Sequence, residues 1–287
     1  MPPYLPAILW VLLSTFIWTL IFAAGKFVDG SIGVFQLTLF RYIGAAATLL
    51  IIVRHAGGLR IHRSTQPWRH LIRAITGSGG AVAITWASAN MPLADATAIG
   101  LSYGVLATLL GAFVLKEVIS GVHWMAILVS LVGVTIIMFS KGAFQNGLVF
   151  LPAAVAFVGA ALFAVEGVYI SMLGRSEAAL TVMLYVTAFG LLLMLGPALL
   201  EWRDTSLWTI LFCVALGPLG VAGQYCTIVG YRSAPLSVVA PVDYSWLIFS
   251  ALLGALVFAE IPNAATWVGG IAILAGGFIL TRTGRGS

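Results

Sequence analysis

Long apolar runs dominate this chain, and they decide which kinds of fold it can adopt. Of its 287 residues, 61% are hydrophobic and only 8% are charged, whereas a soluble globular domain carries about 25% charged residues. A chain with so little charge cannot cover its surface with polar groups in water. An α-helix crosses the hydrocarbon core of a bilayer with about 20 predominantly apolar residues. We therefore expect an all-α integral membrane protein that is surrounded by the lipid bilayer.

Turn-forming and charged residues divide the apolar sequence into ten runs of spanning length. The breaks include Asp29-Gly30, the run Arg54 to Arg69, and Pro262-Asn263, which are residue types that end helices. The first run is long, and no small-residue cleavage site follows a basic segment, so we interpret it as a retained helix rather than a signal peptide. The ten predicted transmembrane helices are 8–28, 33–53, 71–89, 93–115, 121–140, 148–172, 178–200, 207–230, 235–257 and 264–281.

The distribution of positive charge predicts which way the helices point. An even number of spans places both termini on one side of the membrane, and the positive-inside rule assigns that side to the cytoplasm. Ten Lys and Arg residues then lie on the cytoplasmic side, against Lys26, Lys141 and Arg203 on the outer side. This bias explains the net charge of +5, so the charge does not indicate a nucleic-acid partner. The ten cytoplasmic residues are Arg54, Arg60, Arg63, Arg69, Arg73, Lys116, Arg175, Arg232, Arg282 and Arg285.

The second half of the chain repeats the first at a constant offset of 143 residues. Residue types that are rare in this sequence carry the match, because Leu-on-Leu matches arise by chance in any apolar chain. Pro92 falls on Pro235, and Glu117 falls on Glu260. The offset therefore indicates a true internal repeat.

The repeat divides the chain into two halves, 1–143 and 144–287, with five predicted helices in each. Because five is an odd number, the second half must enter the membrane in the opposite orientation. Inverted halves are a common architecture of secondary transporters, which hold their substrate near the midplane between them. We therefore expect ten transmembrane helices in two inverted five-helix repeats.

The matched segments resemble the drug/metabolite transporter superfamily, specifically its EamA-like ten-helix members. The resemblance is carried by residues 233–237, 253–260 and 267–270, with weaker counterparts in the first half at 91–93 and 115–117. It implies a central cavity that is enclosed mainly by the first, third, fourth, sixth, eighth and ninth spans. It also implies a bacterial inner-membrane protein that exports amino acids, including aromatic ones.

Two prolines inside predicted spans are candidate hinges. Pro218 lies in the eighth span and Pro241 in the ninth. In the first half, Ala98 stands opposite Pro241, which departs from strict repeat symmetry. The two halves are therefore not expected to bend equivalently.

Ionisable residues inside the predicted spans are candidates for transport, because a charge is costly in lipid. Glu166 lies in the sixth span and Asp243 in the ninth. Three interpretations of each carboxylate stay open: contact with a polar substrate, a proton-coupling site, or a structural hydrogen bond to a neighbouring helix. We interpret Arg41, in the second span, as a structural residue that snorkels or pairs. Asp95 is expected at the outer interface.

Aromatic and polar residues on the spans around the expected cavity form the second group of candidates. Asp243, Trp246 and Ser250 recur at i, i+3 and i+7, so they share one helix face. Rings mixed with a few hydrogen-bonding groups are typical of small-molecule sites, although Trp and Tyr also anchor helices at membrane interfaces. The candidate substrate-binding residues are Trp18, Trp86, Tyr103, Glu166, Tyr169, Gln224, Tyr225, Asp243, Tyr244 and Trp246.

These patterns predict a secondary transporter that exports amino acids and related small metabolites by alternating access. Efflux of cationic aromatic drugs is the alternative within transport, while a channel or a nucleotide-sugar carrier fits less well. No enzymatic activity is expected, because the four histidines lie in or beside predicted cytoplasmic loops rather than in a catalytic cluster. Cys213 and Cys226 lack the spacing of metal ligands, so we expect neither a metal nor a cofactor. The driving force and the oligomeric state stay open.

Overall fold

The computed structural model describes residues 4–28, 30–56, 58, 63–107, 110, 121–140, 147–233 and 242–283. Within these residues, all regular secondary structure is helical, as the sequence predicts. The helices are α1 (Leu5–Phe27), α2 (Val34–His55), α3 (Pro67–Asn90), α4 (Leu93–Gly100), α6 (Gly121–Ser140), α7 (Gly147–Ser176), α8 (Ala179–Leu200), α9 (Leu207–Ser233), α11 (Ser245–Phe258) and α12 (Ala264–Thr283).

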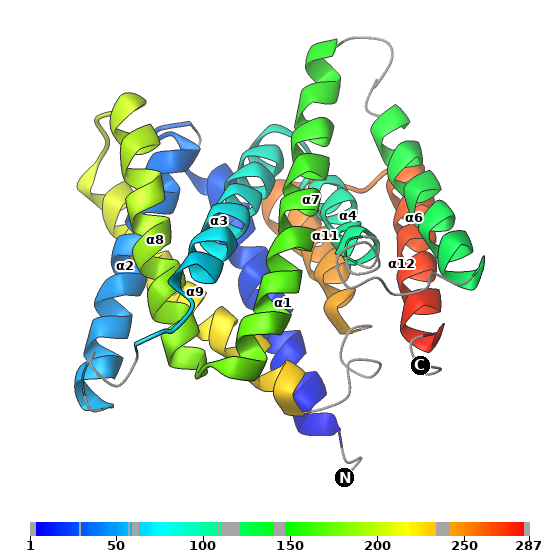
Figure 1. The fold of residues 1–287 in the computed structure, drawn as a ribbon. Helices are drawn as coiled ribbons and strands as arrows, with labels where there is room; N and C mark the ends of the chain where they lie inside the picture. The colour runs from blue at the N-terminus through cyan, green and yellow to red at the C-terminus, as the bar shows by residue number, and fades with distance from the viewer. Residues whose placement is uncertain are drawn as a thin grey trace.

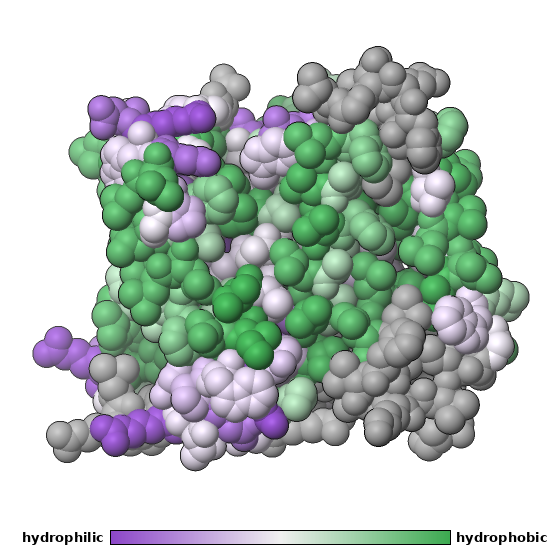
Figure 2. Space-filling model, turned by 45° about the horizontal axis from the view of Figure 1, so that its top comes forward, coloured by the Kyte–Doolittle hydropathy of each residue, from purple (hydrophilic) through white to green (hydrophobic). Residues whose placement is uncertain are grey.

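The length and apolar character of the helices indicate an integral membrane protein. Among the described residues, five helices are long and apolar enough to cross a membrane, namely α1, α2, α8 and most of α7 and α9. Shorter apolar helical segments are Leu93–Ala107, Ile127–Ile137, Ser245–Phe258 and Ala264–Gly276. On the face drawn in Figure 2, apolar side chains form a broad belt and hydrophilic side chains gather toward its two ends. A belt of this kind is what a surrounding bilayer requires.

Over the described residues, the observed helices follow the predicted runs, with interruptions in the fourth and ninth. In the ninth run, a turn at Tyr244 separates residues 242–243 from α11. The helix α6 covers the predicted residues 121–140, whereas α7 and α9 continue a few residues beyond their predicted ends. The fourth run is interrupted, because α4 ends at Gly100 and a turn at Leu101 and Ser102 precedes a further helical segment over 103–107. The Ser102 hydroxyl donates to the carbonyl of Ile99 at 2.7 Å, a local bond that competes with regular helix geometry.

The helices form a bundle in which α2 and α8 lie at one side and α6 and α12 at the other (Figure 1). The helices α1, α3, α4, α7 and α11 lie between these two pairs (Figure 1). There α3 packs along α7, α1 along α9, and α4 against α11. Figure 1 also shows that α1 begins and α12 ends at one end of the bundle, while α7 begins at the opposite end. The helices α1 and α7 therefore run in opposite directions.

Small residues allow some helices to approach until their backbones touch. At the crossing of α2 and α9, a Cβ on Gly44 would lie 1.9 Å from the carbonyl oxygen of Val214. A Cβ on Gly217 would lie 2.2 Å from the amide nitrogen of Ala45. No hydrophobic driving force acts between helices in lipid. Van der Waals packing at close contacts of this kind therefore helps to hold the helices together.

Asp95, which is expected at the outer interface, is buried among the helices. The residue is only 1% exposed, and its carboxylate accepts a hydrogen bond from the hydroxyl of Thr266. The helix α12 packs against α4 and so covers a carboxylate that lies in the first turn of α4. A contact between segments so distant in sequence leaves no local pattern from which it could be predicted.

Candidate functional site

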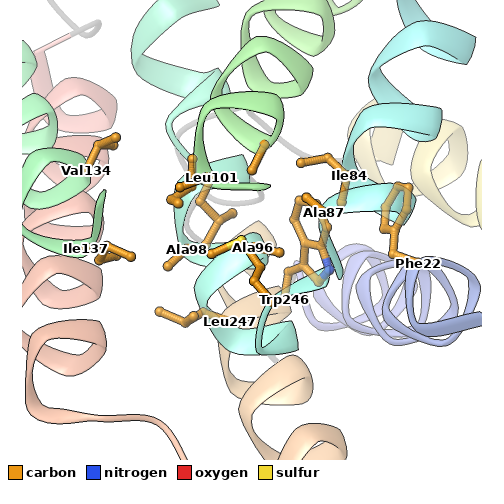
Figure 3. Packing of buried hydrophobic residues seen from close by; sticks show 14 of the residues in the cluster. Phe22, Ile84, Ala87, Ala96, Ala98, Leu101, Val134, Ile137, Trp246 and Leu247 are labelled. Atoms are coloured by element: carbon orange, nitrogen blue, oxygen red, sulfur yellow. The ribbon is translucent and has the colours of Figure 1, made fainter. Parts of the chain in front are cut away.

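Four aromatic rings meet near the centre of the bundle. Trp18 of α1 stacks on Phe22, with their ring centroids 5.8 Å apart. The ring centroid of Phe22 lies 5.2 Å from that of Trp246 of α11 and 6.1 Å from that of Phe163 of α7. Figure 3 shows Phe22 and Trp246 converging beside Ile84 of α3. We call these four residues the central aromatic cluster, because rings at such separations attract one another and offer stacking faces to a ligand.

Gly80 of α3 makes room for the Phe163 ring, whereas at Gly100 of α4 a Cβ would meet the Trp246 ring only in ordinary van der Waals contact. A Cβ on Gly80 would lie 2.7 Å from the Phe163 ring, and one on Gly100 would lie 3.5 Å from the Trp246 ring. The indole Nε1 of Trp246 is buried and has no hydrogen-bond partner among the described residues. An unpaired buried donor is costly, so this N–H is available to a polar group of a bound molecule.

Hydroxyl groups from α1, α9 and α11 border the cluster. The indole N–H of Trp18 donates to the hydroxyl oxygen of Thr227 at 3.4 Å, and the Thr227 and Ser14 hydroxyls are hydrogen-bonded at 2.5 Å. The hydroxyls of Thr15 and Ser245 are 2.7 Å apart. The rings therefore lie beside groups that can donate or accept hydrogen bonds.

Two predicted site residues from different halves of the chain are hydrogen-bonded to each other. The hydroxyl of Tyr103 donates to Oδ2 of Asp243 at 2.9 Å. The turn after α4 precedes Tyr103, and Asp243 lies just before α11. Tyr103 and Tyr244 also pack against the hydrophobic core that contains Trp246. The contact fits a role for Asp243 at the interface between the halves.

A buried ion pair lies between α3 and α7, one helical turn from the cluster. Nη2 of Arg73 is 3.5 Å from Oε1 of Glu166, and the two side chains are 1% and 15% exposed. Gly77 leaves the space that this carboxylate fills, because a Cβ there would lie 2.6 Å from Oε1. Glu166 follows Phe163 by three residues, hence by about 4.5 Å along the helix axis. The same side of α7 therefore carries a ring of the aromatic cluster and then a charged group.

Arg73 is the residue that the sequence analysis missed. It was assigned to the cytoplasmic end of the third span, whereas the structure buries it completely. The available signal was its spacing, because Arg73, Gly77 and Gly80 recur at i, i+4 and i+7 and share one face of α3. An arginine on the small-residue face of an apolar helix points toward a neighbouring helix rather than toward solvent.

A second arginine lies close to this ion pair. Arg41 of α2 is 7% exposed, and its guanidinium lies 4.9 Å from the centre of the Tyr42 ring. The Tyr42 hydroxyl is hydrogen-bonded to Ser78 of α3 at 2.7 Å. Arg41 and Arg73 both act electrostatically on the carboxylate of Glu166. We call Arg41, Arg73 and Glu166 the buried charge group.

Another ion pair ties the helices together at the end of the bundle where α1 ends. Nζ of Lys26 lies 2.6 Å from Oε1 of Glu260 and donates to the carbonyl of Met91 at 3.0 Å. Oε2 of Glu260 accepts a hydrogen bond from the amide of Leu93 at 2.9 Å. This Lys26–Glu260 latch joins α1, the start of α4 and the segment between α11 and α12.

A separate polar contact lies at the opposite end, where α3 begins. Nε2 of His70 is 2.9 Å from Oε2 of Glu177, and the hydroxyl of Ser64 donates to the other oxygen of Glu177. The Tyr185 ring stacks on His70 with centroids 4.8 Å apart. This contact joins the starts of α3 and α8 to the end of α7.

The remaining predicted residues lie outside the aromatic cluster. Tyr225 is 48% exposed and packs edge-on against Trp10, and Tyr169 packs edge-on against Trp68.

Trp86 and Gln224 are half-buried, and Pro218 lies exposed within an unbroken α9. Pro241 is outside the described residues. Among the residues that the structure describes, no three His, Cys, Asp or Glu side chains are grouped so that they could hold a metal.

Rings, hydroxyls and a buried charge group among apolar helices are the composition of a small-molecule site inside a helical membrane protein. The chain belongs to the EamA-like transporter family, whose sequence profile matches it twice, over residues 5–139 and 151–282. The resemblance to the drug/metabolite transporter superfamily is thereby confirmed. The protein is accordingly a transporter and not an enzyme.

Several characterised relatives match the chain over nearly its whole length. A pseudopaline exporter of Pseudomonas aeruginosa is 26% identical, with 97% of both proteins covered. An S-adenosylmethionine uptake transporter of Rickettsia prowazekii is 22% identical over 94% of this chain and 90% of that protein. A riboflavin transporter of Vibrio cholerae is 26% identical over 93% of this chain and 89% of that protein. A solved crystal structure with 22% identity covers 97% of both chains with a TM-score of 0.66, which supports the fold.

Proposed function

We propose that this protein is a secondary transporter that exports amino acids, including aromatic ones, across the bacterial inner membrane by alternating access. The observation that carries the proposal is the central aromatic cluster with a buried charge group one helical turn away. An aromatic amino acid has the same two parts, a ring and a charged head, at a comparable separation. Sites for such molecules combine stacking surfaces with a few polar groups.

The proposal includes ten transmembrane helices in two inverted halves, 1–143 and 144–287, with both termini in the cytoplasm. Displacement by 143 residues carries α6 onto α12, from 121–140 to 264–283. The helix contacts also correspond between the halves. The repeat relates α3 to α9 and α7 to α1, and the contact of α3 with α7 is matched by a contact of α9 with α1. The opposite directions of α1 and α7 support an axis that lies in the membrane plane.

Alternating access requires that the two ends of the bundle open in turn. The Lys26–Glu260 latch holds together helices of both halves at one end, so its release would accompany opening there. The Tyr103–Asp243 hydrogen bond also joins the two halves. Bundles of this kind move largely as rigid bodies around a fixed central site.

The relatives do not decide the substrate, because they are named for three different metabolites. The charges of this chain favour an amino acid over the alternative of a cationic aromatic drug. Glu166 faces Arg73, and a second arginine lies nearby, so a bare cation would be repelled at that position. A zwitterion can present a negative group to the arginines and a positive group to Glu166.

Uptake into liposomes tests the proposal. We expect the purified protein to transport labelled aromatic and large aliphatic amino acids, measured with and without a pH gradient. Glu166→Gln should lower the initial rate about tenfold, the effect of losing about 1.4 kcal/mol of binding or transition-state energy. Glu201→Gln, at an exposed position after α8, is the matched control and should leave the rate unchanged. Failure to transport any amino acid under either condition would contradict amino-acid export and would favour the alternative, efflux of cationic aromatic drugs.

A further inference from the structure

The guanidinium of Arg73 is buried in a way that leaves most of its hydrogen-bonding capacity unused. Its Nε, Nη1 and Nη2 atoms are all buried, and none of them has a hydrogen-bond partner among the residues that the structure describes. The contact of 3.5 Å with Glu166 is an ion pair but is too long for a good hydrogen bond. A guanidinium has five N–H donors in a planar fork and keeps its charge in any protein environment. Buried donors of this kind are costly unless a partner satisfies them.

One carboxylate, Glu166, lies against Arg73, and a second, Glu177, is bonded to His70 one helical turn away on α3. Arg41 and Arg73 contribute two positive charges, and Glu166, on which both act, contributes one negative charge. The hydrogen bond of Tyr42 with Ser78 joins two neutral hydroxyls. An uncompensated charge at this depth is expensive. Glu177 is already held by His70 and Ser64, so the N–H groups of Arg73 that Glu166 does not reach are left for a further anion.

The geometry around the ion pair limits what the missing anion can be. Glu166 and Phe163 both face α3, where Gly77 and Gly80 leave space for the carboxylate and the ring. The charged position is about 4.5 Å along α7 from the aromatic one. A molecule that reaches both must therefore be small and must carry its anionic group close to its ring.

We infer that Arg73 receives a carboxylate of the transported molecule, so that the substrates are small amphipathic carboxylates. The planar fork of arginine matches a carboxylate with two parallel N–H···O bonds. The bound carboxylate satisfies the donors that Glu166 does not reach and neutralises the buried charge group. Glu166 stays beside Arg73 and faces the positive group of a zwitterionic substrate. This inference rests on the proposed transport function and adds to it the group that the substrate must possess.

Binding to the purified protein in lipid nanodiscs tests the inference with matched ligands. L-Phenylalanine is compared with L-phenylalaninamide, which lacks the carboxylate charge, and with 3-phenylpropionate, which lacks the ammonium. We expect the wild type to prefer phenylalanine over its amide by about tenfold to a hundredfold, as for a hydrogen-bonded charged group. Arg73→Met should reduce this preference to about onefold, and Arg73→Lys should keep part of it because the charge is retained.

Two controls separate a binding role from a structural one. Arg54→Met removes a positive charge from an exposed position on α2 and should leave the preference unchanged. Arg73→Met combined with Glu166→Gln removes both charges, so it avoids an unpaired buried carboxylate and should fold even if the single variant does not. An Arg73 that only supports the fold would alter melting temperature in these variants without altering the ratio of the two affinities.

The outcomes distinguish this inference from the proposed function. Equal affinity for phenylalanine and its amide, or a preference that survives in both Arg73→Met variants, would overturn the carboxylate site and leave amphipathic transport intact. Binding of 3-phenylpropionate without binding of any amino acid would support the carboxylate site and overturn amino-acid transport. A wild-type protein that binds none of the three ligands would overturn both.

Discussion

The position of the Glu166 carboxylate depends on a glycine, Gly77, in the facing helix α3. Gly77 has no Cβ, and the carboxylate of Glu166 fills the space where one would lie, beside Arg73. The neighbouring Gly79 faces the Leu162 side chain instead, at 3.1 Å from the position of its own missing Cβ. Two glycines on one helix thus face chemically different partners, and their substitutions should have different consequences.

We predict that Gly77→Ala lowers transport without lowering stability. The new Cβ would lie 2.6 Å from Oε1 of Glu166, the far end of a flexible side chain, so the carboxylate moves while the backbone stays. Alanine also favours the helix over glycine by about 1 kcal/mol. Initial uptake rates in liposomes should fall about fivefold, which corresponds to about 1 kcal/mol, while the melting temperature stays equal or rises. Gly79→Ala is the control and should transport normally, and wild-type rates in Gly77→Ala would contradict the role of Glu166.

At the scale of helices, contacts between backbones hold α2 against α9. The Cβ positions of Gly44 and Gly217 are filled by backbone atoms of the opposite helix. Backbone atoms cannot rotate away as a side chain can, so any added carbon forces the two helices apart. Such contacts set the distance between helices, and hence the position of Arg41, which α2 carries.

We predict that Gly44→Ala destabilises the protein through helix separation. Its Cβ would lie 1.9 Å from the carbonyl oxygen of Val214, and overpacking of this kind costs about 1–3 kcal/mol. Unfolding in mixed micelles, followed by fluorescence, should show a loss of this size. Gly196→Ala, which meets nothing within 4 Å, should be neutral or slightly stabilising. If the two variants were equally stable, the close approach of α2 and α9 would be refuted.

For the whole molecule, the directions of the helices assign the connecting segments to two opposite ends. The helix α2 ends and α3 begins at the end of the bundle where α1 begins, whereas α8 ends and α9 begins at the other end (Figure 1). In the proposed orientation, which follows the positive-inside rule, the first end faces the cytoplasm. The two native cysteines are buried, at 0% and 3% exposure, so they contribute little background to thiol labelling.

We predict that cysteines introduced at the two ends react from opposite sides of the membrane. Asp204→Cys, in the exposed segment before α9, should react with an impermeant thiol reagent in intact cells. Thr65→Cys, in the exposed segment before α3, should react only in inverted vesicles or permeabilised cells. The reverse pattern would mean that the termini lie outside. Labelling of both positions from the same side would contradict the arrangement of the bundle.

Several features of this protein follow from local pattern alone. A run of about twenty apolar residues becomes a helix in lipid, because a single segment can satisfy its own backbone hydrogen bonds there only as a helix. The predicted bounds of α6 are therefore the observed ones. The family, too, was identified from short motifs around Pro235 and Glu260, and the profile match over both halves bears it out. Hydropathy and turn residues predict where the helices begin and end because their effects are local and extend over only a few neighbouring residues.

The partners of the charged residues needed the packed bundle. Hydropathy gives Arg73 and Asp95 a position near a helix end, but it does not show that other helices bury both side chains. The Lys26–Glu260 latch joins residues from opposite ends of the chain. Such pairings depend on the rotation and depth of two helices relative to each other, which are set by side-chain packing over their whole lengths. A helix pattern states which residues share a face, but the neighbour that meets this face is chosen when the helices pack.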